Sequence, residues 1–485
     1  MTLPNTITVG LKDHSMMLID CNQHQLQELR DYFSFFVPGY KFMPAYKSRR
    51  WDGKIKLFNQ INRELNAGLY EHVKKFCSDR MYPLQLQETD YGHPALTNQV
   101  KHQELIKFQD TLNLPFPLYD YQYDAITHGI EKKRALLLSP TGSGKSFIIY
   151  NLMRWYLDNH NKQVLLIVPT TSLEDYGYDV KENVHRIYSG KDKSTDKPII
   201  ISTWQSIYRF SKDWFDTMGC VFGDEVHLFK AKSLSGIMNK CVNAEYRYGT
   251  TGTLDGTETN KLVLEGLFGP TNTVTSTAKL QKDKRLAELD ITILLLRYHN
   301  DICHKYKDAT YQEELDYIVT NEKRNKLISN LALDQKGNSL VLFQFVEKHG
   351  KPLFDMIKDK AGDRPVYYVS GEVETKDREQ IRGIVEGQKN AIIVASLGTF
   401  STGINIRNLH NIVFASPSKS QVKVLQSIGR GLRKSDNGSV TKLYDIADDL
   451  HTKGHKNFTL RHSAERIKIY TKEQFPYKIV QLNLK

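Results

Sequence analysis

The sequence is poor in cysteine and has no long apolar run, and each shortage excludes a class of protein. Only five of its 485 residues are cysteine, and none stands in a Cys-x-x-Cys pair. Neither a disulfide framework nor a zinc cluster is therefore indicated. No run approaches the roughly 18 apolar residues of a membrane span, and the first residues lack the basic start and apolar core of a signal peptide. We expect a protein of a reducing cytoplasm that makes no membrane contact.

Acidic residues are outnumbered by basic ones. The chain has 55 aspartates and glutamates against 67 lysines and arginines, which leaves a formal charge of +12. This surplus favours a polyanionic partner. The length predicts about three domains, because 485 residues exceed what one hydrophobic core normally holds.

Residues 139–146, SPTGSGKS, form the most informative segment. They follow the apolar run 135–138 and precede a helix-patterned stretch at 147–157, which is the order of a phosphate-binding loop. There the glycines let backbone N–H groups close around phosphates, the lysine offsets their charge, and the last hydroxyl can ligate Mg²⁺. The alternative is a plain glycine turn between a strand and a helix. The predicted nucleotide contacts are Pro140, Thr141, Gly142, Ser143, Gly144, Lys145 and Ser146.

An acidic segment, Asp224-Glu225-Val226-His227, follows the apolar residues 220–222. We predict that Asp224 holds Mg²⁺ through water, together with Ser146, and that Glu225 polarises the attacking water. The alternative is an acidic turn on the surface. With the phosphate loop, this segment predicts ATP and Mg²⁺ as cofactors.

Short apolar runs recur in two sets between helical patterns. Because strands of parallel sheets are buried on both faces, such runs predict two α/β domains whose ligands bind at the carboxyl ends of the strands. The first set is 135–138, 164–168, 199–202 and 220–222, and the second is 340–343, 366–369, 391–395 and 412–415.

The first 90 residues follow another plan and predict a small α+β module. Strands are expected at 6–9 and 16–19, followed by a helix whose apolar face holds Leu26, Leu29, Tyr32, Phe33 and Phe36. Residues 41–56 then carry six basic residues against one acidic residue, with aromatic residues between them. Arg49, Arg50, Trp51 and Lys54 are therefore candidates for nucleic-acid contact, the alternative being a solvated hairpin.

The C-terminal half contains two further basic segments. In QSIGRGLR, residues 426–433, Arg430 and Arg433 are three residues apart, so one helical face can aim both guanidinium groups at a phosphate. Such arginine fingers are typically worth about 10³ to 10⁵ in rate, and the alternative is a basic surface helix. Residues 451–485, with eight basic and two acidic residues, predict either a solvated helix face or a nucleic-acid contact.

In this order, SPTGSGKS, DEVH, Thr251-Gly252-Thr253 and QSIGRGLR resemble the DExH branch of superfamily 2 helicases over about residues 118–446. Other segments, such as STWQS at 202–206 and WDGKIKL at 51–57, resemble a small family of T-even phage DNA helicases. This resemblance implies two tandem RecA-like parallel-sheet domains that form a helicase core. The implied boundaries are a small α+β N-terminal domain at 1–90, a linker at 91–117, RecA-like domains at 118–290 and 323–485, and a connector at 291–322.

The resemblance also implies roles for residues that, taken singly, would more often be helix caps or turns. Tyr121 and Gln122 would contact adenine, and Gly403 would touch the nucleotide. Gln426, Arg430 and Arg433 would act on it from the second domain. Residues Thr251, Gly252, Thr253 and His227 would couple the nucleotide to the nucleic-acid track. The track itself would be lined by Thr170, Thr171, Trp204, Gln205, Ser370, Gly371, Thr399 and Thr402, through phosphate contacts that do not depend on base sequence.

The implied function is that of an ATP-driven DNA motor in the cytoplasm of a bacterial host. Its substrates would be branched DNA, namely forks, four-way junctions, R-loops and D-loops, during phage recombination, repair and replication control. We expect a monomer with other phage recombination proteins as partners. Three alternatives stay open: an ATP-dependent RNA helicase, a duplex DNA translocase that does not separate strands, and a passive DNA-binding protein with a degenerate ATPase.

Overall fold

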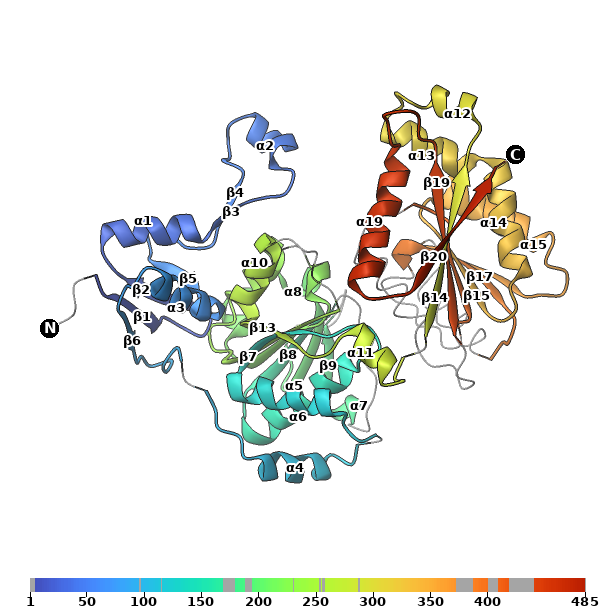
Figure 1. The fold of residues 1–485 in the computed structure, drawn as a ribbon. Helices are drawn as coiled ribbons and strands as arrows, with labels where there is room; N and C mark the ends of the chain where they lie inside the picture. Colours follow the sequence, from blue (N-terminus) through green and yellow to red (C-terminus); the bar gives the residue numbers. More distant parts are fainter. Residues whose placement is uncertain are drawn as a thin grey trace. The chain divides into compact units, whose positions relative to one another are not determined.

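The protein is described by a computed structural model (Figure 1). It places residues 5–95, 97–114, 116–168, 179–187, 194–229, 231–252, 254, 258–286, 288–371, 387–399, 409–417 and 440–484. The chain forms two compact units, residues 1–139 with 144–275, and residues 140–143 with 276–485. Among the residues so placed, no helix is long and apolar enough to cross a membrane.

The N-terminal module is a small α+β fold, as expected. Its sheet has the order β5-β2-β1-β6 and mixes antiparallel and parallel pairs. Its strands are β1 (Ile7–Leu11), β2 (Met16–Asp20), β5 (Glu64–Asn66) and β6 (Leu84–Gln87), and its longer helices are α1 (Gln23–Tyr32) and α3 (Tyr70–Asp79). Leu26, Leu29 and Phe33 are buried in its core. We had expected Phe36 on this helix as well. Instead, α1 ends at Tyr32, and Phe36 lies half-exposed in a strand.

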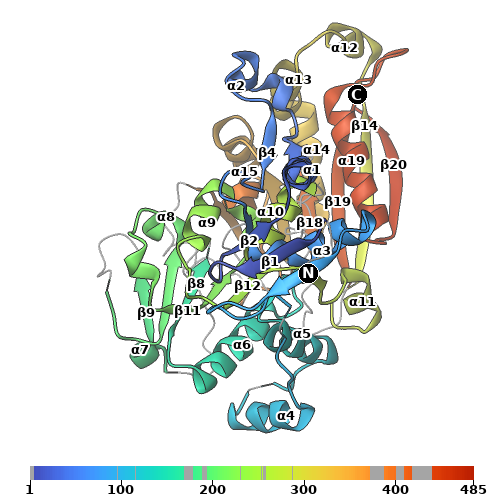
Figure 2. The ribbon, with the colours of Figure 1, turned by 90° about the vertical axis from the view of Figure 1, so that its left-hand side faces the viewer.

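That strand, β3 (Ser34–Phe36), pairs with β4 (Lys54–Lys56) in a separate two-stranded ribbon. Between the two strands lie the short helices η1 (Tyr40–Phe42) and α2 (Pro44–Lys47). Figures 1 and 2 show that this excursion stands away from the four-stranded sheet of the module. Helix α4 (His102–Thr111) follows in the segment that we had predicted as a linker.

The first large sheet has seven strands, all parallel, in the order β13-β7-β12-β11-β8-β10-β9. The strands are β7 (Arg134–Leu138), β8 (Gln163–Val168), β9 (Val184–Ile187), β10 (Ile199–Thr203), β11 (Met218–Gly223), β12 (Tyr246–Thr251) and β13 (Thr271–Thr273). Helices α5 (Asp120–Lys132) and α6 (Lys145–Asn159) cover one face. Helices α8 (Trp204–Ile207), α9 (Ala231–Met238) and α10 (Glu258–Phe268) cover the other (Figure 1).

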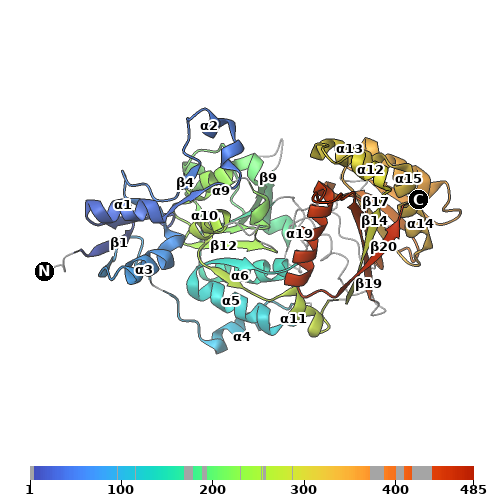
Figure 3. The same cartoon turned by 45° about the horizontal axis from the view of Figure 1, so that its top comes forward.

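The second sheet also has seven parallel strands, in the order β16-β17-β15-β18-β19-β14-β20. The strands are β14 (Leu289–Arg297), β15 (Ser339–Phe343), β16 (Val366–Val369), β17 (Ile392–Ser396), β18 (Asn411–Phe414), β19 (Thr441–Asp449) and β20 (Tyr477–Asn483). Its helices are α12 (Asn300–Lys305), α13 (Tyr311–Thr320), α14 (Glu322–Asp334), α15 (Lys351–Lys358) and α19 (Phe458–Lys472). Figure 3 shows α19 beside this sheet. Two parallel sheets of this kind confirm the predicted fold class.

The second unit differs from the sequence prediction in three places. Residues 289–297, mostly assigned to the connector, form β14 inside the sheet, where most of their side chains are buried. The helix expected across 311–333 is two helices, since Asn321 ends α13 and its side chain caps α14. Arg466, counted in the basic C-terminal helix, is buried against Asp445 at 2.7 Å and cannot contact nucleic acid there.

Candidate active site

The phosphate-binding loop connects β7 to α6, as the sequence predicts. Gly142 and Gly144 have φ values of +85° and +82°, a left-handed conformation that glycine adopts without steric cost. Gly144 lies so close to Gln122 that a Cβ atom there would come within 2.3 Å of the amide nitrogen. Ser143 donates its hydroxyl to the carbonyl of Pro140 at 2.6 Å. The loop thus has a closed turn at its start and its last glycine at the N-terminus of α6, where bound anions are favoured.

Lys145, the first residue of α6, lies against the acidic segment after β11. Its ammonium donates to the Ser139 carbonyl at 3.2 Å and forms an ion pair with Glu225 at 3.2 Å. Both side chains are largely buried, at 11% and 21% exposure. The lysine therefore stands between the phosphate loop and the carboxylate that we predict to act on water.

Asp224 is held by two donors. Thr250, at the end of β12, donates its hydroxyl to the Asp224 carboxylate at 2.6 Å, and the backbone N–H of Glu225 donates to the same oxygen at 3.0 Å. Burial, and then the neighbouring Glu225 carboxylate, raise the pKa of Asp224. A cation beside Asp224 would offset both effects, because it favours the ionised form.

The pKa of Glu225 is shifted in the opposite direction. Burial alone would raise its pKa, but the Lys145 ammonium and His227 outweigh burial, so the pKa of Glu225 is lowered. His227 lies 3.3 Å from one Glu225 oxygen, and the backbone N–H of Gly252 donates to that same oxygen at 3.4 Å. The side chain is thus an ionised carboxylate, which is the state that a base needs.

His227 also connects the acidic segment to β12. Its Nδ1 lies 2.7 Å from the Thr251 hydroxyl. Because β12 lies beside β11 in the sheet, Thr251 and Gly252 meet the acidic segment at neighbouring strand ends. The structure therefore brings together three of the four residues predicted to couple nucleotide and track, while Thr253 lies outside the described residues.

The predicted adenine contacts lie at the start of α5. Tyr121 and Gln122 are each 4% exposed, and Tyr119 stacks on Tyr121 with ring centroids 5.7 Å apart. The Gln122 amide oxygen accepts the backbone N–H of Tyr119 at 3.0 Å. This bond holds the N-terminus of the helix, so Gln122 also has a structural role there that the sequence did not suggest.

The predicted track residues that are described lie at carboxyl ends of strands in both units. In the first unit, Trp204 and Gln205 follow β10, with Trp204 half-buried and Gln205 exposed. In the second unit, Ser370 and Gly371 follow β16, and Thr399 follows β17, where its N–H donates to Ser396 at 3.2 Å. Thr170, Thr171, Thr402, Gly403, Gln426, Arg430 and Arg433 lie outside the described residues, and their roles stay predictions.

The oxygen ligands present at this site suit Mg²⁺. The Ser146 hydroxyl, in the first turn of α6, and the Asp224 carboxylate are oxygen ligands of the kind that Mg²⁺ prefers. Asp224 has no basic side chain in a direct ion pair among the described residues, whereas its neighbour Glu225 does. These two residues would hold the ion, and the ion would supply charge neutralisation at the phosphates.

Known proteins resemble the chain along its whole length. Residues 6–87 match the family described as DNA helicase UvsW, N-terminal, residues 115–256 match the type III restriction enzyme res subunit, and residues 322–435 match the helicase conserved C-terminal domain. The ATP-dependent DNA helicase uvsW of Enterobacteria phage T4 is 37% identical over 504 residues, covering 99% of this chain and 100% of that protein. The chain belongs to the UvsW helicase family.

Structures agree with this membership. The crystal structure of T4 UvsW superimposes with a TM-score of 0.52 at 35% identity, covering 99% of this chain and 100% of that one. A fragment of a putative HsdR subunit from Vibrio vulnificus, with a TM-score of 0.58, 18% identity and coverage of 88% and 78%, shares the fold. The UvsW family membership confirms the predicted resemblance and the predicted enzyme class, an ATP-dependent helicase.

Sequence reasoning missed Thr250. This buried residue of the UvsW-type core positions Asp224, yet it precedes the Thr-Gly-Thr segment and belongs to no contiguous motif. Its only signal was the hydroxyl at the end of a strand. Without knowing that β12 lies beside β11, that hydroxyl could not be paired with Asp224.

Proposed function

We propose that this protein is an ATP-dependent DNA helicase that remodels branched DNA: forks, four-way junctions, R-loops and D-loops. The proposal rests on the relationship to UvsW over the full chain, N-terminal module included. It is supported by the Lys145–Glu225 ion pair, which joins the phosphate loop to the acidic segment. The implied setting is phage recombination, repair and replication control in the cytoplasm of a bacterial host.

The ATP site would work through the groups already described. Backbone N–H groups of the loop around Gly142 and Gly144 bind phosphate, and Lys145 offsets its charge. In this structure Lys145 pairs with Glu225, so an incoming phosphate competes for the lysine. Once released, the Glu225 carboxylate is available to accept a proton from the attacking water. Asp224 and Ser146 would hold Mg²⁺, and Arg430 and Arg433 are proposed to stabilise the transferred phosphate.

Coupling to DNA is proposed to pass through His227. This side chain contacts both Glu225 and Thr251, so any change at Glu225 alters the contacts of β12. The hydroxyl and backbone groups at strand ends, from Trp204 and Gln205 in one unit and Ser370, Gly371 and Thr399 in the other, would bind phosphates of the track. We propose residues 1–90 as the module that grips DNA, and we assign the part of the predicted connector that forms β14 to the second parallel-sheet domain.

The test is the nucleic-acid dependence of ATP hydrolysis. We would compare stimulation by a four-way junction, a fork, a linear duplex, a single strand and a tailed RNA duplex, all at one salt concentration. The proposal expects the two branched DNAs to stimulate hydrolysis at the lowest concentrations. Stimulation by RNA alone would favour the RNA helicase alternative, and equal stimulation by linear and branched duplex would favour a duplex translocase.

A further inference from the structure

The charged turn after helix α11 (Thr277–Lys282) ends in a buried apolar side chain. This turn, residues 283–286, is here called the link. Asp283 and Lys284 are exposed, whereas Leu286 is only 4% exposed. Strand β14 of the second sheet begins three residues later, at Leu289. A leucine that is buried at the end of a solvated segment is held by what it packs against, and that neighbour indicates its role.

The backbone of the link fixes the position of Leu286. Lys284 takes a left-handed conformation, with a φ of +54°, and turns the chain back towards α11. The N–H groups of Arg285 and Leu286 then both donate to the Leu280 carbonyl, at 2.8 and 3.2 Å. Leu280 is itself fully buried. The Leu286 side chain is therefore presented from a backbone of defined shape.

Leu286 packs on the phosphate-binding loop. Its Cδ2 lies 2.7 Å and its Cγ 3.9 Å from the position that a Cβ atom on Gly142 would take. Accordingly, residues 140–143 belong to the same compact unit as residues 276–485, and not to the unit that contains β7 and α6. The start of the loop therefore packs with the link, although strand and helix flank the loop in the sequence.

The loop is contacted at both of its glycines. Gly144 faces the Gln122 amide, and Gly142 faces Leu286. Backbone N–H groups of such a loop bind phosphate only when they converge on it, and glycines have no side chain with which to hold that arrangement. Apparent affinity falls in proportion to the fraction of molecules in the competent shape. A side chain that packs on Gly142 therefore acts on phosphate binding.

We propose that Leu286 is a positioning residue for ATP, which packs on Gly142 and holds the phosphate loop in the shape that binds phosphate. This inference rests on the proposed function, in which the loop binds ATP. It adds a residue that lies outside the segments matched by the three family models, 6–87, 115–256 and 322–435. Because Leu286 closely precedes β14, the contact also connects the ATP site to the second sheet.

The experiment compares the full-length protein with Leu286→Ala, Leu286→Met and Leu289→Ala. Leu289 is similarly buried, at 3% exposure, and lies in β14, so its variant controls for the loss of a buried leucine near the link. Titration with a fluorescent ADP analogue without DNA gives nucleotide affinity. Steady-state hydrolysis at one fixed DNA concentration gives KM and kcat. Thermal unfolding is recorded for every variant.

We expect Leu286→Ala to raise the KM for ATP and the dissociation constant for the ADP analogue by the same factor, roughly tenfold, as for a loop that is in the competent shape a tenth of the time. Its kcat should stay at the wild-type value, because Glu225 and Asp224 keep their contacts. Leu286→Met, which keeps an apolar contact of similar volume, should restore both constants. Leu289→Ala should lower thermal stability and change neither constant.

A purely structural role for Leu286 would lower the unfolding temperature and the active fraction, and so reduce kcat at an unchanged KM. Unchanged nucleotide constants in Leu286→Ala would therefore contradict the inference even where the wild type hydrolyses ATP. A lower KM would also contradict it, since Leu286 would then obstruct the loop. Should Leu286→Ala not fold, Leu286→Val decides by the same two constants. If the wild type itself neither binds nor hydrolyses ATP, the proposed function fails first.

Discussion

At the residue scale, Glu225 combines an uncommon backbone conformation with a side chain that contacts Lys145 and His227. Its φ of +48° is left-handed, a conformation that non-glycine residues adopt in a few per cent of cases and that gathers at functional sites. This turn follows β11 directly and brings the carboxylate to Lys145 and His227. The local strain is therefore associated with the contacts that lower the pKa of Glu225.

The first prediction concerns these two partners. Glu225→Gln should reduce ATP turnover by about 10²- to 10⁴-fold, because the amide cannot accept the proton of the attacking water. Lys145→Ala should abolish turnover by removing the charge that offsets the phosphates. DNA affinity should change little in both. Steady-state hydrolysis with and without DNA measures the effect, and wild-type rates in either variant would contradict the assigned site.

The second prediction concerns Thr250. Thr250→Val removes the hydroxyl that donates to Asp224 while keeping the shape of the side chain. Because groups that orient a metal ligand typically contribute 10- to 100-fold to metal affinity, the Mg²⁺ concentration for half-maximal hydrolysis should rise by about that factor. Thr250→Ser, which keeps the hydroxyl, should restore it. An unchanged Mg²⁺ dependence in Thr250→Val would show that Asp224 needs no such support.

Most of the proposed ATP site stands in contiguous sequence motifs. Lys145, Asp224 and Glu225 were proposed from loop and strand context alone, and the structure brings these three residues together. Their mutual arrangement could not be, since the Lys145–Glu225 ion pair depends on the order β7-β12-β11 in the sheet. The same holds for Thr250 and for the capping contact of Gln122.

At the element scale, the N-terminal module is docked on the first large sheet through backbone contacts. Gly68, in the turn η2 (Ala67–Leu69), packs so tightly on the end of α10 that a Cβ atom would lie 2.1 Å from the Glu265 carbonyl oxygen. Nearby, His72 lies 2.9 Å from the Glu265 carboxylate. Ser15 donates to the Met238 carbonyl at 3.0 Å. The module and this sheet therefore pack together within the first compact unit.

The third prediction tests this docking. Gly68→Val should destabilise the protein by about 1–3 kcal/mol, the usual cost of overpacking, because the backbone of α10 cannot move away easily. Gly236→Ala is the control, since a Cβ atom at Gly236, in α9, would have nothing within 4 Å. Thermal unfolding and limited proteolysis of the module report the effect. Equal stability of the two variants would mean that the interface tolerates a shift.

The fourth prediction concerns pH and the turn η5 (Val346–Gly350) of the second unit. His349 is fully buried beside Ser416, 2.8 Å from its hydroxyl. Burial, and then Arg324, hold the pKa of His349 well below its ordinary value of 6.5. The unfolded chain therefore takes up this proton first, and stability falls as the pH drops below about 6.5, by up to about 1.4 kcal/mol per pH unit.

His349→Gln should remove that part of the slope. Other histidines, such as the half-buried His14, whose pKa burial lowers to about 4, keep their share. The difference between wild type and variant in urea midpoint, followed from about pH 7.5 to 5.5, is therefore the measurement. Parallel curves for the two proteins would contradict a neutral buried His349.

The strands that could be predicted were those with uninterrupted apolar runs. Strands β12 and β19 were missed because they contain charged residues, and in each case the fold buries the charge with partners. Arg247 in β12 donates to the Ala244 and Met238 carbonyls, and Asp448 in β19 pairs with Arg324 at 2.7 Å. Strand β20 was missed for another reason: it is an edge strand whose side chains are mostly exposed.

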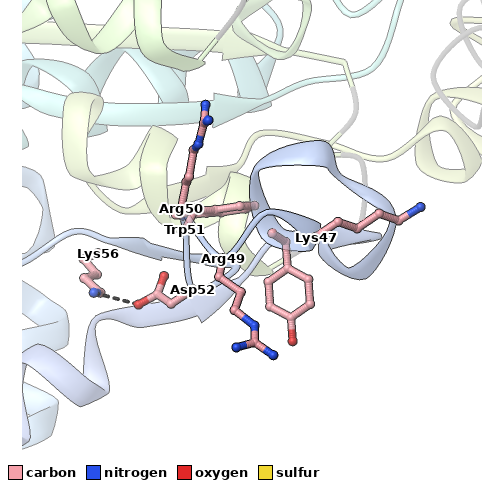
Figure 4. A pocket seen from close by; sticks show the side chains of 7 residues that line it. Lys47, Arg49, Arg50, Trp51, Asp52 and Lys56 are labelled. Atoms are coloured by element: carbon pink, nitrogen blue, oxygen red, sulfur yellow. Dashed lines mark ion pairs between the residues drawn. The ribbon is translucent and has the colours of Figure 1, made fainter.

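At the scale of the whole molecule, the function depends on the features that this family adds to a parallel-sheet fold shared with many other proteins. Parallel sheets of this kind occur in many ATPases, so the fold alone does not identify the nucleic acid that is moved. Motifs could predict the helicase core, whereas the preferred geometry of a DNA substrate depends on surface shape and charge, which no contiguous motif encodes. The basic surplus of +12 is consistent with DNA, and residues 41–56 of the N-terminal module carry part of that charge, with Arg49, Arg50 and Trp51 lining an open pocket (Figure 4).

The measurement that tests the account most directly is ATP-driven conversion of a labelled four-way junction into duplex products, with Lys145→Ala as the blank and a tailed RNA duplex as the competing substrate. We predict that the wild type converts the junction only with ATP, that the blank does not, and that the RNA stays paired. If the junction persists while the RNA duplex opens, the ATP site is right and the assignment to branched DNA is wrong.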